Sequence, residues 1–189
     1  MPVADVAAIE VQADGPERRV TVTGSAGHLA VRYTSRDEPL VTGLIGRLRQ
    51  RAAGDPMPVP PGQQRTGILA GGWRPGRPAL CGLDAADAAA AVMVRSRRLG
   101  RGLCLAAMTP REFIAVRAGR GIWWWRCHVT TLYIPRRRID AASLSSGSLL
   151  LRSSGVNLNV RLGGRKAGAA VSRWFGHPSS DHDHSGTGG

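Results

Sequence analysis

The stretch GIWWWRCHVTTLYIPRRRID, residues 121–140, decides how the second half of the chain folds. Its middle, VTTLYIP, is rich in β-branched and aromatic residues and ends at a proline, which predicts a β-strand. Strict alternation would put Trp123 and Trp125 on one face and Trp124 on the other. Both faces cannot belong to one core. The favoured interpretation buries two tryptophans and places the third over an edge, and the alternative is an interaction site.

Arginines gather on both sides of this region. Arg136, Arg137 and Arg138 follow the strand end, where a solvated loop is the default interpretation and contact with an anion is the alternative. A second cluster precedes the first strand of the second half and consists of Arg95, Arg97, Arg98 and Arg101. For this cluster the sequence leaves three contacts open: anionic lipid, RNA or an acidic surface of a protein.

The composition is that of a basic globular chain. It has 189 residues, 42% of them apolar, and 26 Lys+Arg against 13 Asp+Glu, with Lys166 the only lysine. The three cysteines, Cys81, Cys104 and Cys127, fit neither a disulfide framework nor a zinc site and predict a reducing compartment. Neither a signal segment nor an apolar run long enough to span a bilayer is evident. We therefore expect a cytoplasmic protein.

The first half predicts three strands and one helix. VAAIEV, RRVTVT and HLAVRY are separated by turn residues, and the last alternates as a half-buried strand would through Leu29, Val31 and Tyr33. SRDEPLVTGLIGRLRQR then predicts a helix, with Pro39 in its first turn. The expected apolar stripe of that helix is Leu40, Leu44, Ile45 and Leu48.

The rest of the chain divides into four segments. Residues 52–83 are rich in proline and glycine and predict a linker, and DAADAAAAVMVRSRR predicts a helix over 84–98. Residues 99–176 predict a series of short strands followed by a helix that contains Ala170, Val171 and Trp174. Residues 177–189 are of low complexity and predict a disordered tail.

The two halves share an apolar pattern, which indicates a duplication. Val6, Ile9 and Val11 correspond to Ile139, Ala142 and Leu144. Val20 and Val22 correspond to Leu149 and Leu151. The last strands correspond through Leu29, Val31 and Tyr33 in the first half and Leu158, Val160 and Leu162 in the second.

Residues 99–176 resemble the bacterial pleckstrin-homology-like (PH-like) domain. The resemblance lies in LCLAAMTPREFIAVR, TTLYIPRRRIDAASL and SLLLRSSGVNLNVRLG with a closing helix. The matching positions are Thr109, Arg111, Ile134, Pro135, Ile139, Leu144, Gly155 and Trp174. Residues 1–51 resemble the back end of a second copy without its front strands.

The resemblance implies an α+β fold: a PH-like antiparallel β-sheet or partial barrel closed by a C-terminal helix, with a partial second copy. It also implies that an upstream segment, the middle of the chain or a partner supplies the pairing that the first half lacks. We expect the first half to pack against the helix of residues 84–97 or the second sheet. The loop MTPRE contains Arg111 as its only basic residue, whereas the lipid-binding members of the wider fold family have a basic cluster in this loop.

No enzyme motif is present, and His28 and His128 are isolated, so we expect no catalytic residue, no metal site and no cofactor. The chain is predicted to be a non-enzymatic binding or scaffolding module. Its expected partner is another protein or a second copy of itself. Nucleic acid and anionic membrane lipid, bound through the arginines, are the alternatives.

Overall fold

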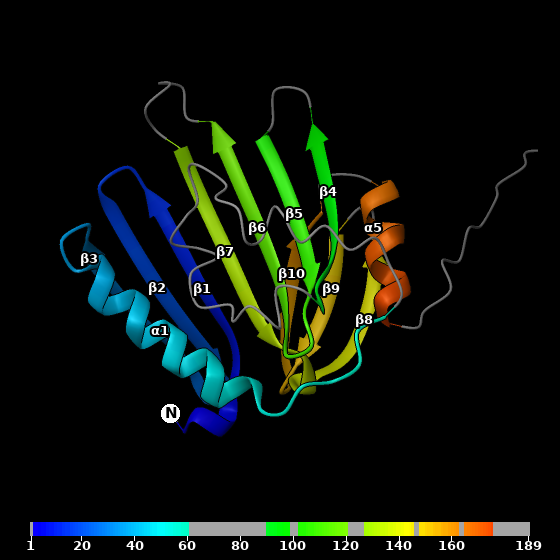
Figure 1. Ribbon diagram of the computed structural model, residues 1–189, viewed down its shortest axis with the longest axis horizontal. Coiled ribbons are helices and arrows are strands. Elements are labelled where there is room, and N and C mark those ends of the chain that lie inside the picture. Colours follow the sequence, from blue (N-terminus) through cyan, green and yellow to red (C-terminus); the bar gives the residue numbers. More distant parts are fainter. Residues whose placement is uncertain are drawn as a thin grey trace, which may run out of the picture.

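The computed structural model describes residues 2–60, 90–98, 102–120, 127–145, 148–162 and 165–175. Within these ranges the chain is mostly β-strand (Figure 1). A seven-stranded antiparallel sheet has the order β3-β2-β1-β7-β6-β5-β4, and a three-stranded sheet has the order β10-β9-β8. The first half contributes β1 (Val6–Asp14), β2 (Glu17–Gly24) and β3 (Gly27–Thr34). The second half contributes β4 (Val92–Arg98), β5 (Gly102–Met108), β6 (Glu112–Arg120), β7 (Cys127–Pro135), β8 (Ile139–Ser145), β9 (Ser148–Ser153) and β10 (Val156–Arg161).

The predicted fold class is wrong. The described chain is a mainly β fold, and it is not a PH-like sheet closed by a C-terminal helix. Its two α-helices are α1 (Glu38–Ala53) and the eight-residue α5 (Arg165–Ser172), which contacts β4, β8 and β9. The prediction failed because alternation identifies strands but not their distant partners: β1 pairs antiparallel with β7, so the strands of the first half extend the sheet of the second half.

The helix predicted over 84–98 is wrong for residues 92–98, which form β4 and pair with β5. Alanine and arginine favour a helix in isolation, but pairing with an adjacent strand overrides that preference here. Residues 84–89 lie outside the described residues. So do residues 61–83 of the predicted linker and the predicted tail, 177–189.

Most predicted strands are confirmed, and within residues 99–176 β5 and β6 are joined by a turn at Thr109 and Pro110. The Thr109 hydroxyl closes this turn by accepting hydrogen bonds from the amides of Arg111, at 3.2 Å, and Glu112, at 2.9 Å. A threonine in this role is an ordinary turn former, because its side chain replaces a missing backbone partner.

The core has two parts, one on each face of the seven-stranded sheet. On the face that α1 covers, here called the α1 face, buried residues include Ile9, Val11, Val20, Val116 and Tyr133. The opposite face packs against the three-stranded sheet and α5 and is here called the small-sheet face; its buried residues include Met108, Phe113, Ile134, Leu151 and Val160. Figure 1 shows α1 on the β3 side of the large sheet and α5 on the β4 side.

A buried ion pair fixes α1 to the sheet. Arg49 of α1 is 2% exposed and Glu112 of β6 is 5% exposed. The Nε of Arg49 lies 3.1 Å from one carboxylate oxygen of Glu112, and an Nη lies 2.5 Å from the other. The guanidinium carbon also lies 3.8 Å from the ring centroid of Tyr133 in β7. These contacts hold α1 toward the middle of the sheet.

The apolar stripe predicted for α1 is half right. Ile45 and Leu48 pack against the core together with Val41. Leu40 and Leu44, however, are 67% and 50% exposed. The helix is rotated relative to the predicted stripe because the buried Arg49 contributes to its packed face.

The structure supports the internal similarity between the two halves. A one-turn 3-10 helix, η1 (Val3–Asp5) or η2 (Arg136–Arg138), is followed in each half by three antiparallel strands and then by α1 or α5. The first strand of each set has an irregular register just after its first residue, between Val6 and Ala8 and between Ile139 and Ala141. The last strands, β3 and β10, are therefore equivalent.

Candidate functional site

Strand β3 is an edge of the large sheet and has no second neighbour in the part of the chain that is described. Among the described residues it pairs only with β2, from Glu17–Thr34 to Gly24–Gly27, without a bulge. It holds no proline and no lysine, the residues with which proteins commonly block edge strands. In a hairpin with a two-residue turn the residues that flank the turn exchange hydrogen bonds, and the pairs alternate from there. The amides of His28, Ala30 and Arg32 therefore point outward.

An apolar strip runs along this edge. Leu29 and Val31 of β3 lie on the α1 face and are 62% and 50% exposed. The prediction that β3 is half buried is thus wrong for these two residues, although Tyr33 is partly buried. Together with Leu40 and Leu44 of α1 they form what we call the β3 edge surface, and these four are the most exposed large apolar residues of the described chain.

The two leucines of α1 lie on the β3 side of the helix. At 3.6 residues per turn, Arg49 occupies the flank of α1 that faces β7, and Leu40 and Leu44 occupy the other flank. That flank also holds the exposed Arg47 and Arg51. The β3 edge surface therefore has an apolar centre and a basic rim.

The equivalent surface in the second half is covered. Leu158 of β10 is partly buried, and Val160 and Leu162 are 4% and 2% exposed, because they pack against the large sheet. Their counterparts Leu29 and Val31 have no such cover among the described residues. The same structural unit thus has its outer apolar residues buried in one half and open in the other.

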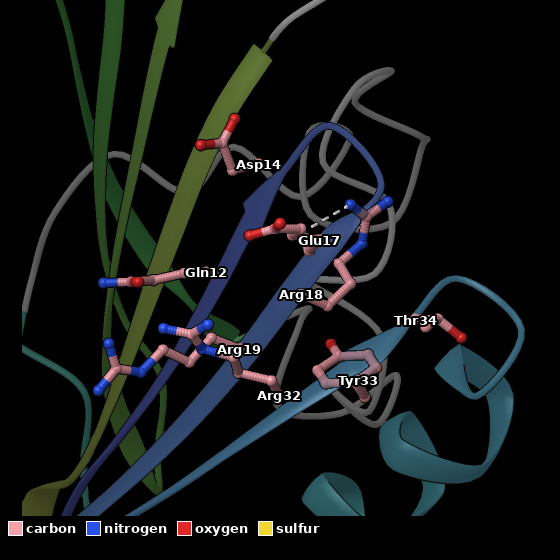
Figure 2. Close-up of a pocket in the computed structure, with 8 residues that line it drawn as sticks. All are labelled: Gln12, Asp14, Glu17, Arg18, Arg19, Arg32, Tyr33 and Thr34. Atoms are coloured by element: carbon pink, nitrogen blue, oxygen red, sulfur yellow. Dashed lines mark hydrogen bonds between the residues drawn. The ribbon is translucent and has the colours of Figure 1, made fainter.

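Two arginines lie side by side on the opposite face of β3. Arg19 of β2 pairs directly with Arg32 of β3, and both are exposed on the small-sheet face. Figure 2 shows both side chains projecting to the same side as Gln12. They line a hollow of about 430 Å³. Its other lining residues are Gln12, Asp14, Glu17 and Thr34 from the same face and Arg18 and Tyr33 from the α1 face.

Most nearby acidic groups already have partners. Asp14 lies 3.0 Å from Nδ1 of His128, and Glu10 accepts a hydrogen bond from the Gln12 amide. On the α1 face, Glu38 lies 3.9 Å from Nε of Arg18. Burial is the main reason that the pKa of Tyr33 is raised, and Glu38 adds to the effect. Neither Arg19 nor Arg32 makes a side-chain hydrogen bond or ion pair in the part of the chain that is described.

The start of α1 is held to the end of β3 by Asp37. Its carboxylate accepts hydrogen bonds from the hydroxyl of Thr34, at 2.8 Å, and from the backbone amide of Thr34, at 3.2 Å. These bonds, the hydroxyl first, lower the pKa of Asp37. They stabilise the turn that places α1 beside β3.

The predicted arginine clusters lie elsewhere. Arg95, Arg97 and Arg98 are in β4, where they pair with Leu105, Leu103 and Gly102 at the edge farthest from β3. Arg101, Trp123, Trp124 and Trp125 lie outside the described residues.

Two of the three arginines of η2 bind neighbouring loops of the chain through hydrogen bonds or an ion pair. Arg136 donates to the carbonyls of Met57, Pro58, Thr109 and Pro110, and burial lowers its pKa. Arg137 pairs with Asp55 at 3.2 Å. Arg138 is partly buried, and its carbonyl accepts a hydrogen bond from the Ser154 amide. The structure gives Arg136 a structural role, and anion contact by the other two stays a prediction.

Sequence reasoning did not single out Arg19 and Arg32. The signal was present, because the two-residue turn between Gly24 and Gly27 fixes which residues of the hairpin oppose each other.

Among the described residues, no helix is both long enough and apolar enough to cross a membrane. Comparison of the chain with protein-family models, with curated proteins and with solved structures finds no match, so the PH-like resemblance gains no support from them.

Proposed function

We propose that this chain is a non-enzymatic protein-binding module that accepts a β-strand of another protein at the edge of β3. The observation that carries the proposal is the coincidence of a strand edge that no described residue covers with the four exposed apolar residues of the β3 edge surface. Adding a strand to a sheet edge is a common mode of peptide recognition: backbone hydrogen bonds provide affinity, and side chains on alternate positions provide specificity.

The energy available is sufficient for a moderate affinity. Burying the exposed parts of Leu29, Val31, Leu40 and Leu44 contributes on the order of 5 kcal/mol before the cost of ordering the partner. The unpaired amides and carbonyls of β3 add backbone hydrogen bonds. The second half of the chain supports this interpretation, because there the equivalent residues of β10 are buried against a sheet.

Nucleic acid and anionic lipid, the alternatives predicted from the arginine content, make no use of an unpaired backbone edge. Strand addition therefore makes a distinguishing prediction. Proline at residue 30 removes an outward amide and leaves the hydrogen bonds between β2 and β3 in place, so Ala30→Pro blocks the edge without unfolding the hairpin. Ala30→Val keeps the amide and is the matched control.

The probe is a fluorescein-labelled peptide of eight residues, the length of β3, in which valine alternates with threonine. Fluorescence anisotropy with the full chain is expected to show binding by the wild type and by Ala30→Val, and none by Ala30→Pro at unchanged thermal stability. Equal binding by Ala30→Pro, or binding by none of the three proteins, contradicts the proposed function.

A further inference from the structure

We infer that the strand accepted by β3 carries acidic side chains on every second residue, and that these bind Arg32 and Arg19. The inference rests on the proposed function and specifies the chemistry of the partner. An added strand alternates its side chains between the two faces of the sheet. On the α1 face these side chains meet the apolar β3 edge surface, and on the small-sheet face they meet the arginines.

Neither member of the arginine pair forms an ion pair with a carboxylate of the described chain. Like charges directly opposite each other on adjacent strands repel, and Arg19 and Arg32 occupy such a position. Asp14 and Glu10 are engaged with His128 and Gln12. The remaining carboxylate on this face of the hairpin is Glu17, at the opposite end of β2 from the turn and across from Thr34. None of these three carboxylates forms an ion pair with Arg19 or Arg32, so both guanidinium groups remain available to a carboxylate of a partner.

The distances suit carboxylates from an added strand. Adjacent strands lie about 4.8 Å apart, so the added strand is one spacing from Arg32 and roughly 10 Å from Arg19. A glutamate opposite Arg32 is within reach of its guanidinium group, and Arg19, one strand farther from the edge, reaches that glutamate when its long side chain turns toward β3. Guanidinium groups bind carboxylates through two parallel hydrogen bonds, which gives this pairing both strength and orientation.

Charge also argues against a second copy of this chain as the occupant. Strand β3 contains no acidic residue, so pairing β3 with itself would give Arg32 no carboxylate to bind. The exposed Arg47 and Arg51 on the neighbouring flank of α1 would add to the repulsion, and the chain as a whole has a formal charge of +13. An acidic partner gains from all of these charges.

The test compares three labelled eight-residue peptides with the full chain by fluorescence anisotropy. Valine alternates with glutamate in the first, with threonine in the second and with lysine in the third. The wild type is expected to bind the glutamate peptide about tenfold more tightly than the threonine peptide, with a preference that shrinks at high salt. The lysine peptide is expected to bind most weakly.

Two variants locate the effect. Arg32→Glu is expected to abolish the preference for glutamate and to favour the lysine peptide, and Arg32→Gln is the milder version if the reversal lowers stability. Arg117→Glu is the matched control, because Arg117 is an exposed arginine on the same face, in β6, four strands away from β3. It changes the net charge equally and is expected to leave the preference intact.

The outcomes separate the two proposals. If all three peptides bind equally and binding still depends on Ala30, strand addition stands and the acidic partner is refuted. An equal loss of preference in Arg32→Glu and Arg117→Glu refutes it too, because long-range charge then explains the effect. If no peptide binds, both proposals fail. Binding of a single-stranded oligothymidylate that Arg32→Glu abolishes and Ala30→Pro does not would assign the arginines to nucleic acid and overturn the inference.

Discussion

Breaking the Arg49–Glu112 pair should destabilise the protein far more than removing both charges together. Both side chains are almost completely buried, and their contacts are bidentate. Removing one partner leaves the other as an uncompensated buried charge, which costs about 3–5 kcal/mol. We therefore expect Glu112→Leu and Arg49→Met each to lower the melting temperature by roughly 6–20 °C.

The double variant is the informative comparison. Arg49→Met combined with Glu112→Leu replaces the pair by apolar side chains of similar size, and its stability is expected to lie within about 1 kcal/mol of the wild type or above it. Arg47→Met, two residues earlier on α1 and exposed, is the control and should change stability by less than about 0.5 kcal/mol. Urea denaturation followed by circular dichroism measures all four proteins.

One result would refute this reasoning: a cost below about 1 kcal/mol for either single variant. It would mean that the buried charge finds another partner or water. The same measurements bear on the binding surface, because the pair sets the position of α1 and hence of Leu40 and Leu44. Where a single variant remains folded, it is expected to bind the valine–threonine peptide more weakly than the wild type does.

Three smaller effects follow from individual side chains. The hydroxyl of Thr131 is fully buried and has no hydrogen-bond partner among the described residues. Thr131→Val should therefore stabilise the protein by about 1 kcal/mol in denaturant melts. A loss of stability would indicate that the hydroxyl has a partner. Gly43 lies inside α1 with open space where a Cβ would lie, so Gly43→Ala should stabilise by about 1 kcal/mol, and destabilisation would contradict that geometry. The pKa of Asp37 measured by NMR should lie below its ordinary value and should rise in Thr34→Ala. The stability that this carboxylate contributes is present above its unfolded-state pKa and is lost as the pH falls through the lower folded-state pKa. An unshifted pKa would contradict the Thr34 contacts.

Local structure was largely predictable from the sequence. The alternation of apolar and polar residues identified β1, β2 and β3, because a strand with one buried face records that face at every second position. Pairing over long distances was not predictable: nothing in the residues of β1 specifies β7 as its neighbour. β4 was missed for a related reason, since its conformation depends on pairing with β5 and its own residues favour a helix.

The candidate site was predictable only in part. Placing Arg19 opposite Arg32 needs only the hairpin turn, so the sequence contained that information. The exposure of Leu29 and Val31 did not follow from their pattern, because alternation shows that one face is apolar and not whether anything covers it. Leu158 and Val160 have the same pattern and are covered. Only the arrangement of the two sheets distinguishes the two cases.

The most direct test of the central claim, strand addition at β3, is residue-resolved amide hydrogen exchange of the full chain with and without the valine–glutamate peptide. The amides of Leu29 and Val31 already bond to β2, whereas those of His28, Ala30 and Arg32 point outward. Strand addition at β3 predicts that the peptide slows exchange at His28, Ala30 and Arg32 and leaves β10, an edge strand of the three-stranded sheet, unchanged. Unchanged exchange at these three amides while the peptide is bound would contradict it.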